Sequence, residues 1–186
     1  MEEYAQKGDL VNLKDVFDMN NLENKYNQKW IDLSTYNDGM YGLYISADVK
    51  SLVWYNPKKF EEKGYKVPET WDELQSLMTK MKENGDTPWS VGLEAGGSSG
   101  WPGTDWIEDI MLRTAGPEVY DKWVNHDISW TDPRVKEAWK KFGNIVNSQK
   151  NVWGGPMTVL STNFGDAASP LFMDPPKAYM HKQASF

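Results

Sequence analysis

The sequence predicts an α/β chain in which short strands and amphipathic helices follow one another. Two observations support this fold class. The stretch Tyr41–Asn56 holds two apolar runs rich in β-branched and aromatic residues, Tyr41–Ile45 and Leu52–Tyr55, which predict strands. Helix-start signals, each followed by apolar residues at helical spacing, come after this stretch.

The polar insert between the two runs, Ser46–Ser51, contains no two-residue turn with a glycine. Because tight hairpins depend on such turns, we do not expect a hairpin here. We expect one extended segment that crosses from one packing unit into another. Asp48 and Lys50 would project from this crossing, where a cleft between two units would lie, either as a surface ion pair or as ligand contacts.

The residues before the crossing predict short helices. A helical turn is expected over Leu13–Phe17, and a helix with Asn20 or Asn21 as its N-cap is expected to run to about Trp30. Asn37-Asp38-Gly39 is a turn signal that leads into the first apolar run. The apolar residues expected to face a core are Leu10, Val11, Leu13, Val16 and Phe17.

Three helices after the crossing have clear start signals. Asn56-Pro57 predicts an N-cap and a first helical residue, Thr70 and Glu73 predict a capping box, and Asp132-Pro133 starts a long helix. Trp89–Leu93 predicts a short buried strand. The residues expected to be buried on the second and third of these helices are Leu74, Leu77, Met78, Met81, Val135, Ala138, Trp139, Phe142, Ile145 and Val146.

The second half of the chain contains two loops. Residues 94–106 form a glycine-rich loop before a helix whose expected N-cap is Thr104 or Asp105. Residues 154–177 predict a long loop with one turn of helix, and residues 179–186 predict a strand that reaches the last residue. The residues of the helix after the first loop that are expected to point inward are Ile107, Ile110, Met111 and Thr114.

Composition argues against several classes of function. With 20 Lys and Arg against 27 Asp and Glu, the chain has no basic stripe to neutralise phosphates, so nucleic acid is not an expected partner. The absence of Cys and the presence of only two His disfavour metal sites, and we expect no cofactor. Neither a phosphate-binding loop nor a serine nucleophile motif occurs.

Aromatic residues are abundant, with ten Trp, nine Tyr and six Phe, although the mean hydropathy is −0.69. Flat rings cover the apolar faces of sugars and planar polar groups bond their hydroxyls, so this composition suits a carbohydrate site. Most tryptophans nonetheless pack in cores, and Trp54, Trp71 and Trp139 fall at strand or helix core positions.

Three other tryptophans are candidates for such a site. Trp101 lies in the glycine-rich loop, either as an aromatic platform for a ligand or as an anchor of the loop. Trp153, which precedes Gly154-Gly155, has the same two interpretations as Trp101. Trp106 falls in the first turn of the following helix, where we expect it to pack rather than to bind a ligand. The acidic residues near the start of this helix are expected to interact favourably with the helix dipole.

Four stretches carry a resemblance to a known family: Glu3–Leu13, Tyr41–Leu74, Gly100–Gly116 and Phe164–Phe186. The most specific is the run in which a strand is followed by Tyr-Asn-Pro, a helix and the sequence PETWDEL. The sequence resembles the extracellular solute-binding proteins of ABC importers, in the family 1 group that binds sugars, and within that group its α-glucoside-binding members.

The resemblance implies a two-lobed α/β protein of the type II periplasmic-binding-protein class, with a hinge and a sugar cleft between the lobes. It implies that this chain is an internal part of such a protein. Residues 1–48 would be the part of lobe one that leads to the hinge, and residues 49–186 most of lobe two. An aromatic residue just after the last strand often stacks on ligand in this family, and it would lie beyond this chain.

The function implied by the resemblance is capture of an oligosaccharide, an α-glucoside in particular, for the membrane subunits of an ABC importer. No catalysis is implied. The location would be the extracellular side of the membrane or the periplasm, with any signal or lipoprotein segment outside this chain. By position, the residues that would line the cleft or its lobe-two loop are Asp48, Lys50, Trp101, Thr104, Asp105 and Trp106.

Two alternatives stay open. A carbohydrate-active enzyme would use a pair of carboxylates. A binding protein of the same fold would take a non-sugar ligand, such as a peptide or a polyamine. In either case a lobe without its neighbours exposes apolar surface and an unpaired strand edge, which predicts dimerisation or strand exchange.

Overall fold

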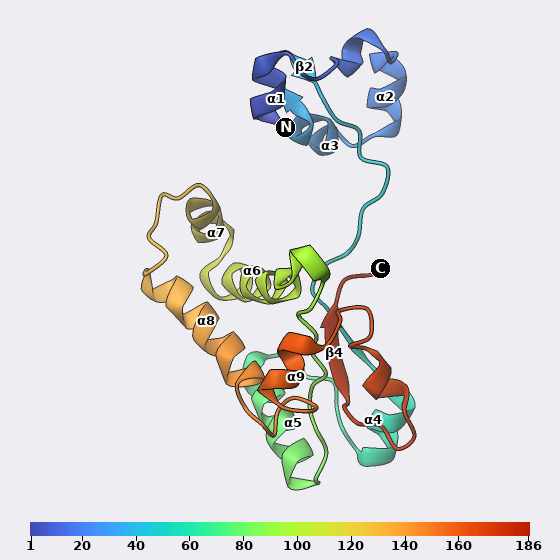
Figure 1. Cartoon of the computed structure of the whole chain (residues 1–186), viewed down its shortest axis with the longest axis vertical. Helices are drawn as coiled ribbons and strands as arrows, with labels where there is room; N and C mark the ends of the chain where they lie inside the picture. Colours follow the sequence, from blue (N-terminus) through green and yellow to red (C-terminus); the bar gives the residue numbers. More distant parts are fainter. The chain divides into compact units, whose positions relative to one another are not determined.

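The computed structural model describes residues 1–186, and the chain divides into two compact units, Met1–Asp48 and Val49–Phe186 (Figure 1). The assignment of these units to the lobes of a larger protein stays a prediction. The expected strand at Tyr41–Ile45 is wrong, because residues 41–50 have no regular structure and Ile45 is 90% exposed. Strand-forming residues make a strand only when another strand bonds to their backbone.

The first unit consists of short helices and a small hairpin. Its elements are α1 (Glu2–Lys7), the 3-10 helix η1 (Leu13–Asp15), α2 (Met19–Lys25), α3 (Gln28–Leu33), β1 (Thr35–Tyr36) and β2 (Gly39–Met40). The single helix expected up to Trp30 is two helices. Asp18 is the N-cap of α2, Tyr26 is extended, and the Asn27 side chain accepts a hydrogen bond from the Lys29 N–H to cap α3.

The predicted turn at Asn37-Asp38 is confirmed, because it joins β1 to β2 with Tyr36 opposite Gly39. Asn37 has a φ of 50°, a left-handed conformation that Asn tolerates. The core of this unit is small and centres on Leu22, Ile31 and Met40. The expectation that residues of the first turns face a core is therefore wrong for three of them, which are exposed: Val11, Val16 and Phe17.

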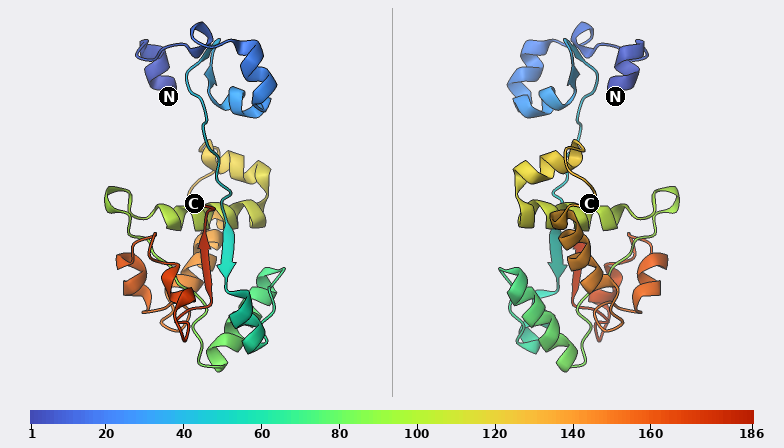
Figure 2. Two further views of the ribbon diagram at one scale, coloured as in Figure 1. Left: turned by 90° about the vertical axis from the view of Figure 1, so that its right-hand side faces the viewer. Right: turned by 90° about the vertical axis from the view of Figure 1, so that its left-hand side faces the viewer.

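The second unit is organised around two antiparallel strands, β3 (Leu52–Tyr55) and β4 (Met180–Gln183). Figure 2 shows them side by side and running in opposite directions. The other elements are α4 (Pro57–Lys63), α5 (Trp71–Glu83), η2 (Gly96–Ser98), α6 (Trp101–Ala115), α7 (Pro117–Val124), α8 (Pro133–Val146), α9 (Pro156–Ser161) and η3 (Ser169–Phe172). The strand predicted at the end of the chain is thus confirmed, but it ends at Gln183.

Residues 89–93, predicted as a strand, begin beside Met180 of β4. They are extended and mostly buried, but they make isolated bridges rather than a continuous ladder. Trp89 is bridged to Val152 and to Met180, and Glu94 is bridged to Asn163. This segment therefore connects β4 with the residues just before and just after α9.

The helix starts follow the predicted caps at Asn56, Thr70 and Asp132, and the Thr70–Glu73 capping box is complete. The expected N-cap at Thr104 or Asp105 is wrong. Helix α6 begins at Trp101, because Gly100 has a φ of 102° and turns the chain into the helix. Trp101 and Thr104 therefore lie in the first turn of α6 rather than in the loop.

The core of the second unit is built from the inner faces of α5, α6, α7 and α8 against residues 89–93 and β4. Trp71 packs against this core as expected. The core assignments of Trp54 and Trp139 are wrong, since these side chains are 45% and 49% exposed. Trp139 lies at the margin of the apolar stripe of α8, and Trp54 lies on an open face of β3. Thr114 is exposed as well, not inward.

The pairing of β3 with β4 sorts side chains onto two faces, because alternate residues of a strand point to opposite sides. Val53 and Lys182 are opposite each other and line one cavity. Trp54 and His181 are opposite each other and line a hollow on the other side. No strand pairs with the second edge of β3.

The closest backbone approach in this arrangement is at Gly92, where an added Cβ would lie 2.7 Å from the Thr162 carbonyl oxygen and 2.9 Å from the Ala167 Cβ. We predict that Gly92→Ala lowers the free energy of unfolding by about 1–3 kcal/mol, because backbone atoms must move. Urea denaturation measures this value. Gly97→Ala is the control, because nothing lies within 4 Å of its Cβ. Equal stability of the two variants would contradict the prediction.

Candidate functional site

An aromatic cluster with one cation over it lies at the start of α6. The Trp101 ring is 5.0 Å from the Phe164 ring and 5.8 Å from the Phe186 ring, measured between centroids. The Lys50 ammonium lies 4.8 Å from the Trp101 centroid and 5.5 Å from that of Phe186. These four residues, with Asp105, are called the Trp101 cluster below.

Lys50 is held in the cluster by Asp105. Its Nζ donates to Asp105 Oδ2 over 2.7 Å, and the two side chains are 50% and 20% exposed. An ion pair with this exposure contributes little to stability, at most about 1 kcal/mol. Its effect is positional, because it fixes an ammonium group over the Trp101 ring in a cation–π arrangement.

Phe164 reaches the cluster because its backbone is tied to residue 94. The Phe164 N–H donates to the Glu94 carbonyl oxygen over 3.0 Å. The Glu94 carboxylate accepts hydrogen bonds of 2.6 Å from the Gly96 N–H and from the Asn163 amide. These two bonds, the one from Gly96 first, lower the pKa of Glu94, so an anionic acceptor stands at the edge of the loop.

A second polar group is buried beneath the cluster. The Lys182 side chain is 4% exposed, donates to the Asp105 carbonyl oxygen over 3.3 Å and lies 3.8 Å from the Asp109 carboxylate. Burial lowers the pKa of Lys182, against the opposing effect of Asp109. Its ammonium also lies 5.1 Å from the Trp106 centroid. Lys182 thus supports the first turns of α6 from below.

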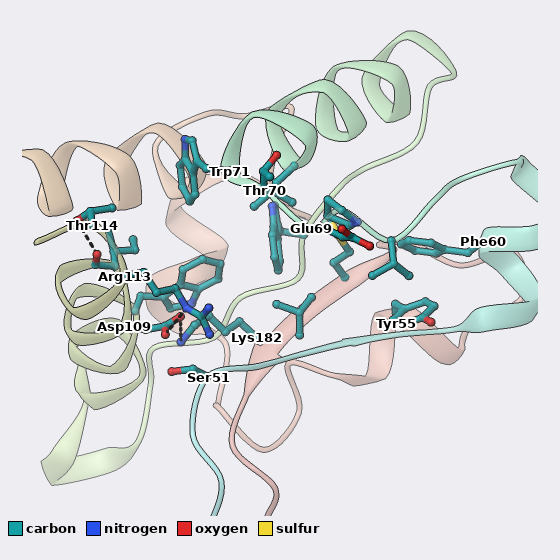
Figure 3. Close-up of a pocket in the computed structure, with 18 residues that line it drawn as sticks. Ser51, Tyr55, Phe60, Glu69, Thr70, Trp71, Asp109, Arg113, Thr114 and Lys182 are labelled. Carbon is teal, nitrogen blue, oxygen red and sulfur yellow. Dashed lines mark hydrogen bonds and ion pairs between the residues drawn. The ribbon is translucent and has the colours of Figure 1, made fainter. Parts of the chain in front are cut away.

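Lys182 also lines a cavity of about 580 Å³ between β3, the start of α5 and α6 (Figure 3). Figure 3 shows Asp109, Arg113 and Lys182 together near Ser51, while the far end is aromatic, with Phe60 among the labelled residues. The remaining lining is mainly apolar side chains of the core and of β3. Of the tryptophans proposed from the sequence as site residues, only Trp106 lines this cavity.

The structure brings together three of the residues predicted for the site: Lys50, Trp101 and Asp105. Thr104 is exposed beside them, and its hydroxyl donates to the Trp101 carbonyl oxygen over 2.9 Å. Asp48 is the last residue of the first unit.

Two of the residues predicted for the site lie outside the Trp101 cluster. Trp106 is 4% exposed, with its ring 5.1 Å from that of Trp89 and 5.8 Å from that of Phe142, so it is a core residue as its helical position indicated. Trp153 is half-buried, and its backbone N–H donates to the Trp89 carbonyl oxygen over 2.8 Å. Trp153 makes no ring contact with the Trp101 cluster.

Sequence reasoning missed Phe164 and Phe186 as members of the cluster. β4 ends at Gln183, so the predicted strand does not reach the last residue and Phe186 follows it as an aromatic residue after a strand. The weak alternation of the last residues gave no sign of where the strand stops. Phe164 had no local signal, since its place depends on the Glu94 contacts.

The model of the family described as bacterial extracellular solute-binding protein matches residues 1–172. The chain belongs to this family. Its members work in the periplasm or on the extracellular side of the membrane, and this is the location of the protein. No helix in residues 1–186 has the length and apolar character to cross a bilayer.

Two relatives match nearly the whole chain. One is the osmoprotective compounds-binding protein GgtB of Synechocystis, 46% identical over all of this chain and 44% of its own length. The other is the alpha-glucosides-binding periplasmic protein AglE of Rhizobium meliloti, 49% identical over 98% of this chain and 41% of its own length. The chain therefore spans less than half the length of these relatives.

Solved structures agree on the fold. A chitin oligosaccharide binding protein superposes with a TM-score of 0.81 at 25% identity, over 99% of this chain and 43% of the other. The solute receptor AcbH superposes with a TM-score of 0.69 at 27% identity, over the same shares. The α/β fold is thus that of type II periplasmic binding proteins, of which residues 1–186 correspond to a part.

The two histidines give a matched test of the pH dependence of stability. His181 is buried, and burial lowers its pKa below the ordinary 6.5, so its neutral form stabilises the fold. This contribution is complete above pH 6.5 and is lost as the pH falls toward the folded-state pKa, because the unfolded chain then binds more protons. We predict that His181→Asn, which keeps an N–H donor toward Ser90, flattens the loss of stability just below pH 6.5.

The measurement is urea denaturation at a series of pH values. The exposed His126 has a φ of 63°, which Asn also tolerates, so His126→Asn is the control and should keep the wild-type pH profile. If the two variants gave the same profile, His181 would not be the group responsible.

Proposed function

We propose that the protein is the solute-binding component of an ABC importer and that its ligand is an oligosaccharide of the α-glucoside class. The single observation that carries this proposal is the Trp101 cluster, which presents aromatic ring surface beside a fixed ammonium and carboxylate. Family membership and the 49% identity to an α-glucosides-binding protein support it.

The chemistry of the cluster suits a sugar. The apolar C–H face of a pyranose would lie on the Trp101 or Phe186 ring, and covering roughly 100 Å² of apolar surface contributes about 2.5 kcal/mol. Sugar hydroxyls both donate and accept, so they would bond Lys50 as acceptors and the carboxylates of Asp105 and Glu94 as donors. Binding of this kind needs no covalent step.

In the whole protein, we propose that two lobes close around the ligand and that residues 49–186 form most of the second lobe. Asp48 and Thr104 are proposed as further hydroxyl contacts on the basis of the resemblance. Trp153 stays a predicted ligand contact, whereas Trp106 is assigned to packing. The membrane subunits of an importer are the proposed partner.

A second class of ligand has a specific observation in its favour. A relative that matches all of this chain is an osmoprotective compounds-binding protein, at 46% identity. The same cluster of rings and hydroxyl-bonding groups would serve a small polyhydroxylated solute. A cationic ligand, such as a polyamine, is less suited, because Lys50 already lies over the ring.

The test is calorimetric titration of the full-length protein with maltose, trehalose, sucrose and longer α-glucosides. We predict micromolar or tighter binding without turnover, and a loss of at least about tenfold, or about 1.4 kcal/mol, in Trp101→Ala, because the ring surface is removed. Trp139→Ala is the control, since Trp139 is an exposed tryptophan on α8, outside the cluster. A folded protein that binds none of these sugars would overturn the α-glucoside assignment.

We further propose that the 186-residue chain self-associates through the free edge of β3. That edge carries no charged residue, and Val53 is 47% exposed beside the 580 Å³ cavity. An apolar, unpaired edge is a template for pairing with another chain.

We predict that Val53→Lys shifts the sedimentation coefficient of the chain toward that of a monomer, because a charge on an edge strand opposes pairing. Val124→Lys is the control, since Val124 is similarly exposed at the end of α7. Wild-type chain that sediments as a monomer at every concentration would contradict the proposal.

A further inference from the structure

The hollow on the Trp54 side of β3 and β4 has no role in the site described so far. It has a volume of about 340 Å³, and it is lined by residues of β3, of β4 and the end of the chain, and of η3 and the segment before it. Phe164 and Phe186 line this hollow and also contact Trp101. The hollow is therefore continuous with the Trp101 cluster, and the two share these rings.

The hollow presents large aromatic surface to solvent. Trp54 is 45% exposed, Phe186 60% and Phe172 71%. Trp54 is fixed in place, because its indole N–H donates to the Gln183 carbonyl oxygen across the strand pair over 3.1 Å. Contiguous exposed rings of this kind mark binding surfaces, whereas single exposed apolar residues do not.

Two uncharged polar groups stand among these rings. The Nδ1 of His181 donates to the Ser90 carbonyl oxygen, 2.9 Å away, since a carbonyl only accepts, and Nε2 of the neutral ring is then an acceptor. The Gln183 side-chain oxygen accepts from the Ala184 N–H over 2.9 Å, which leaves its NH₂ group as a donor. The hollow thus offers an acceptor and a donor beside ring faces.

None of the residues that line the hollow is an acid, a lysine or an arginine. A charged ligand would have no counter-charge there, which disfavours polyamines and acidic sugars. The volume is that of roughly ten water molecules, which suits one pyranose unit. Neutral rings, a donor and an acceptor together are the chemistry that recognises an uncharged sugar.

We propose that this hollow is a second sugar subsite, in which Trp54 and Phe172 bind the next unit of an oligosaccharide whose first unit lies on Trp101. The inference rests on the proposed function and deepens it. It sets the ligand class as a chain of neutral sugars long enough to reach from Trp101 past Phe164 and Phe186 to Trp54, rather than a single ring or a short disaccharide.

The test is calorimetric titration of the full-length protein with maltose, maltotriose and maltotetraose. We expect Trp54→Ala to weaken the longer sugars by about tenfold or more and to change maltose by less than about twofold, which makes the effect depend on chain length. Trp54→Phe keeps a ring and should retain most of the affinity. Phe172→Ala, at a more exposed position, should act in the same direction. Trp139→Ala should change nothing.

The outcomes separate the two proposals. If the wild type binds none of the three sugars, the proposed function is overturned and this inference with it. If the wild type binds them and Trp54→Ala and Phe172→Ala behave as Trp139→Ala does, only the second subsite is overturned. An equal loss for all chain lengths would also overturn it, because Trp54 would then act on the first unit or on the fold.

Discussion

The antiparallel pairing of β3 with β4 is the constraint on which the rest of the second unit depends. It joins residues that are far apart in the chain, and its register places Trp54 opposite His181 and Val53 opposite Lys182. Because alternate residues face opposite sides, this one ladder creates both the 580 Å³ cavity and the aromatic hollow. A shift of one residue in register would exchange the two faces.

The same alternation gives neighbouring residues of β4 different electrostatic tasks. Burial lowers the pKa of both His181 and Lys182, so each is more easily neutralised than in water. Lys182 has the carboxylate of Asp109 within 3.8 Å and stays beneath α6, whereas His181 bonds only a carbonyl oxygen. A charge-bearing face and an uncharged face thus follow from two adjacent positions in the sequence.

Helix starts were predictable because caps are local. Asn56, Thr70 and Asp132 each bond a backbone N–H within a few residues, and the structure has these contacts. The start of α6 was not predictable in this way, because Gly100 turns the chain into the helix without a capping side chain. Lys50, Trp101 and Asp105 were predicted for the site, but Phe164 and Phe186 join them through contacts between distant segments, which no local pattern encodes. The failure at Tyr41–Ile45 has the same cause, because a strand needs a partner.

One feature of the β3–β4 pair has a mechanical meaning. The chain enters this unit at Val49, and Ser185 lies just after the end of β4; these two residues are hydrogen-bonded to each other in both directions, at 3.0 Å each. A residue before β3 and a residue after β4 thus lie at the same end of an antiparallel ladder. A pull on the two ends would break the ladder bonds one after another, as in a zipper, rather than all at once in shear, so tension along the chain would open this unit from the Val49 end first.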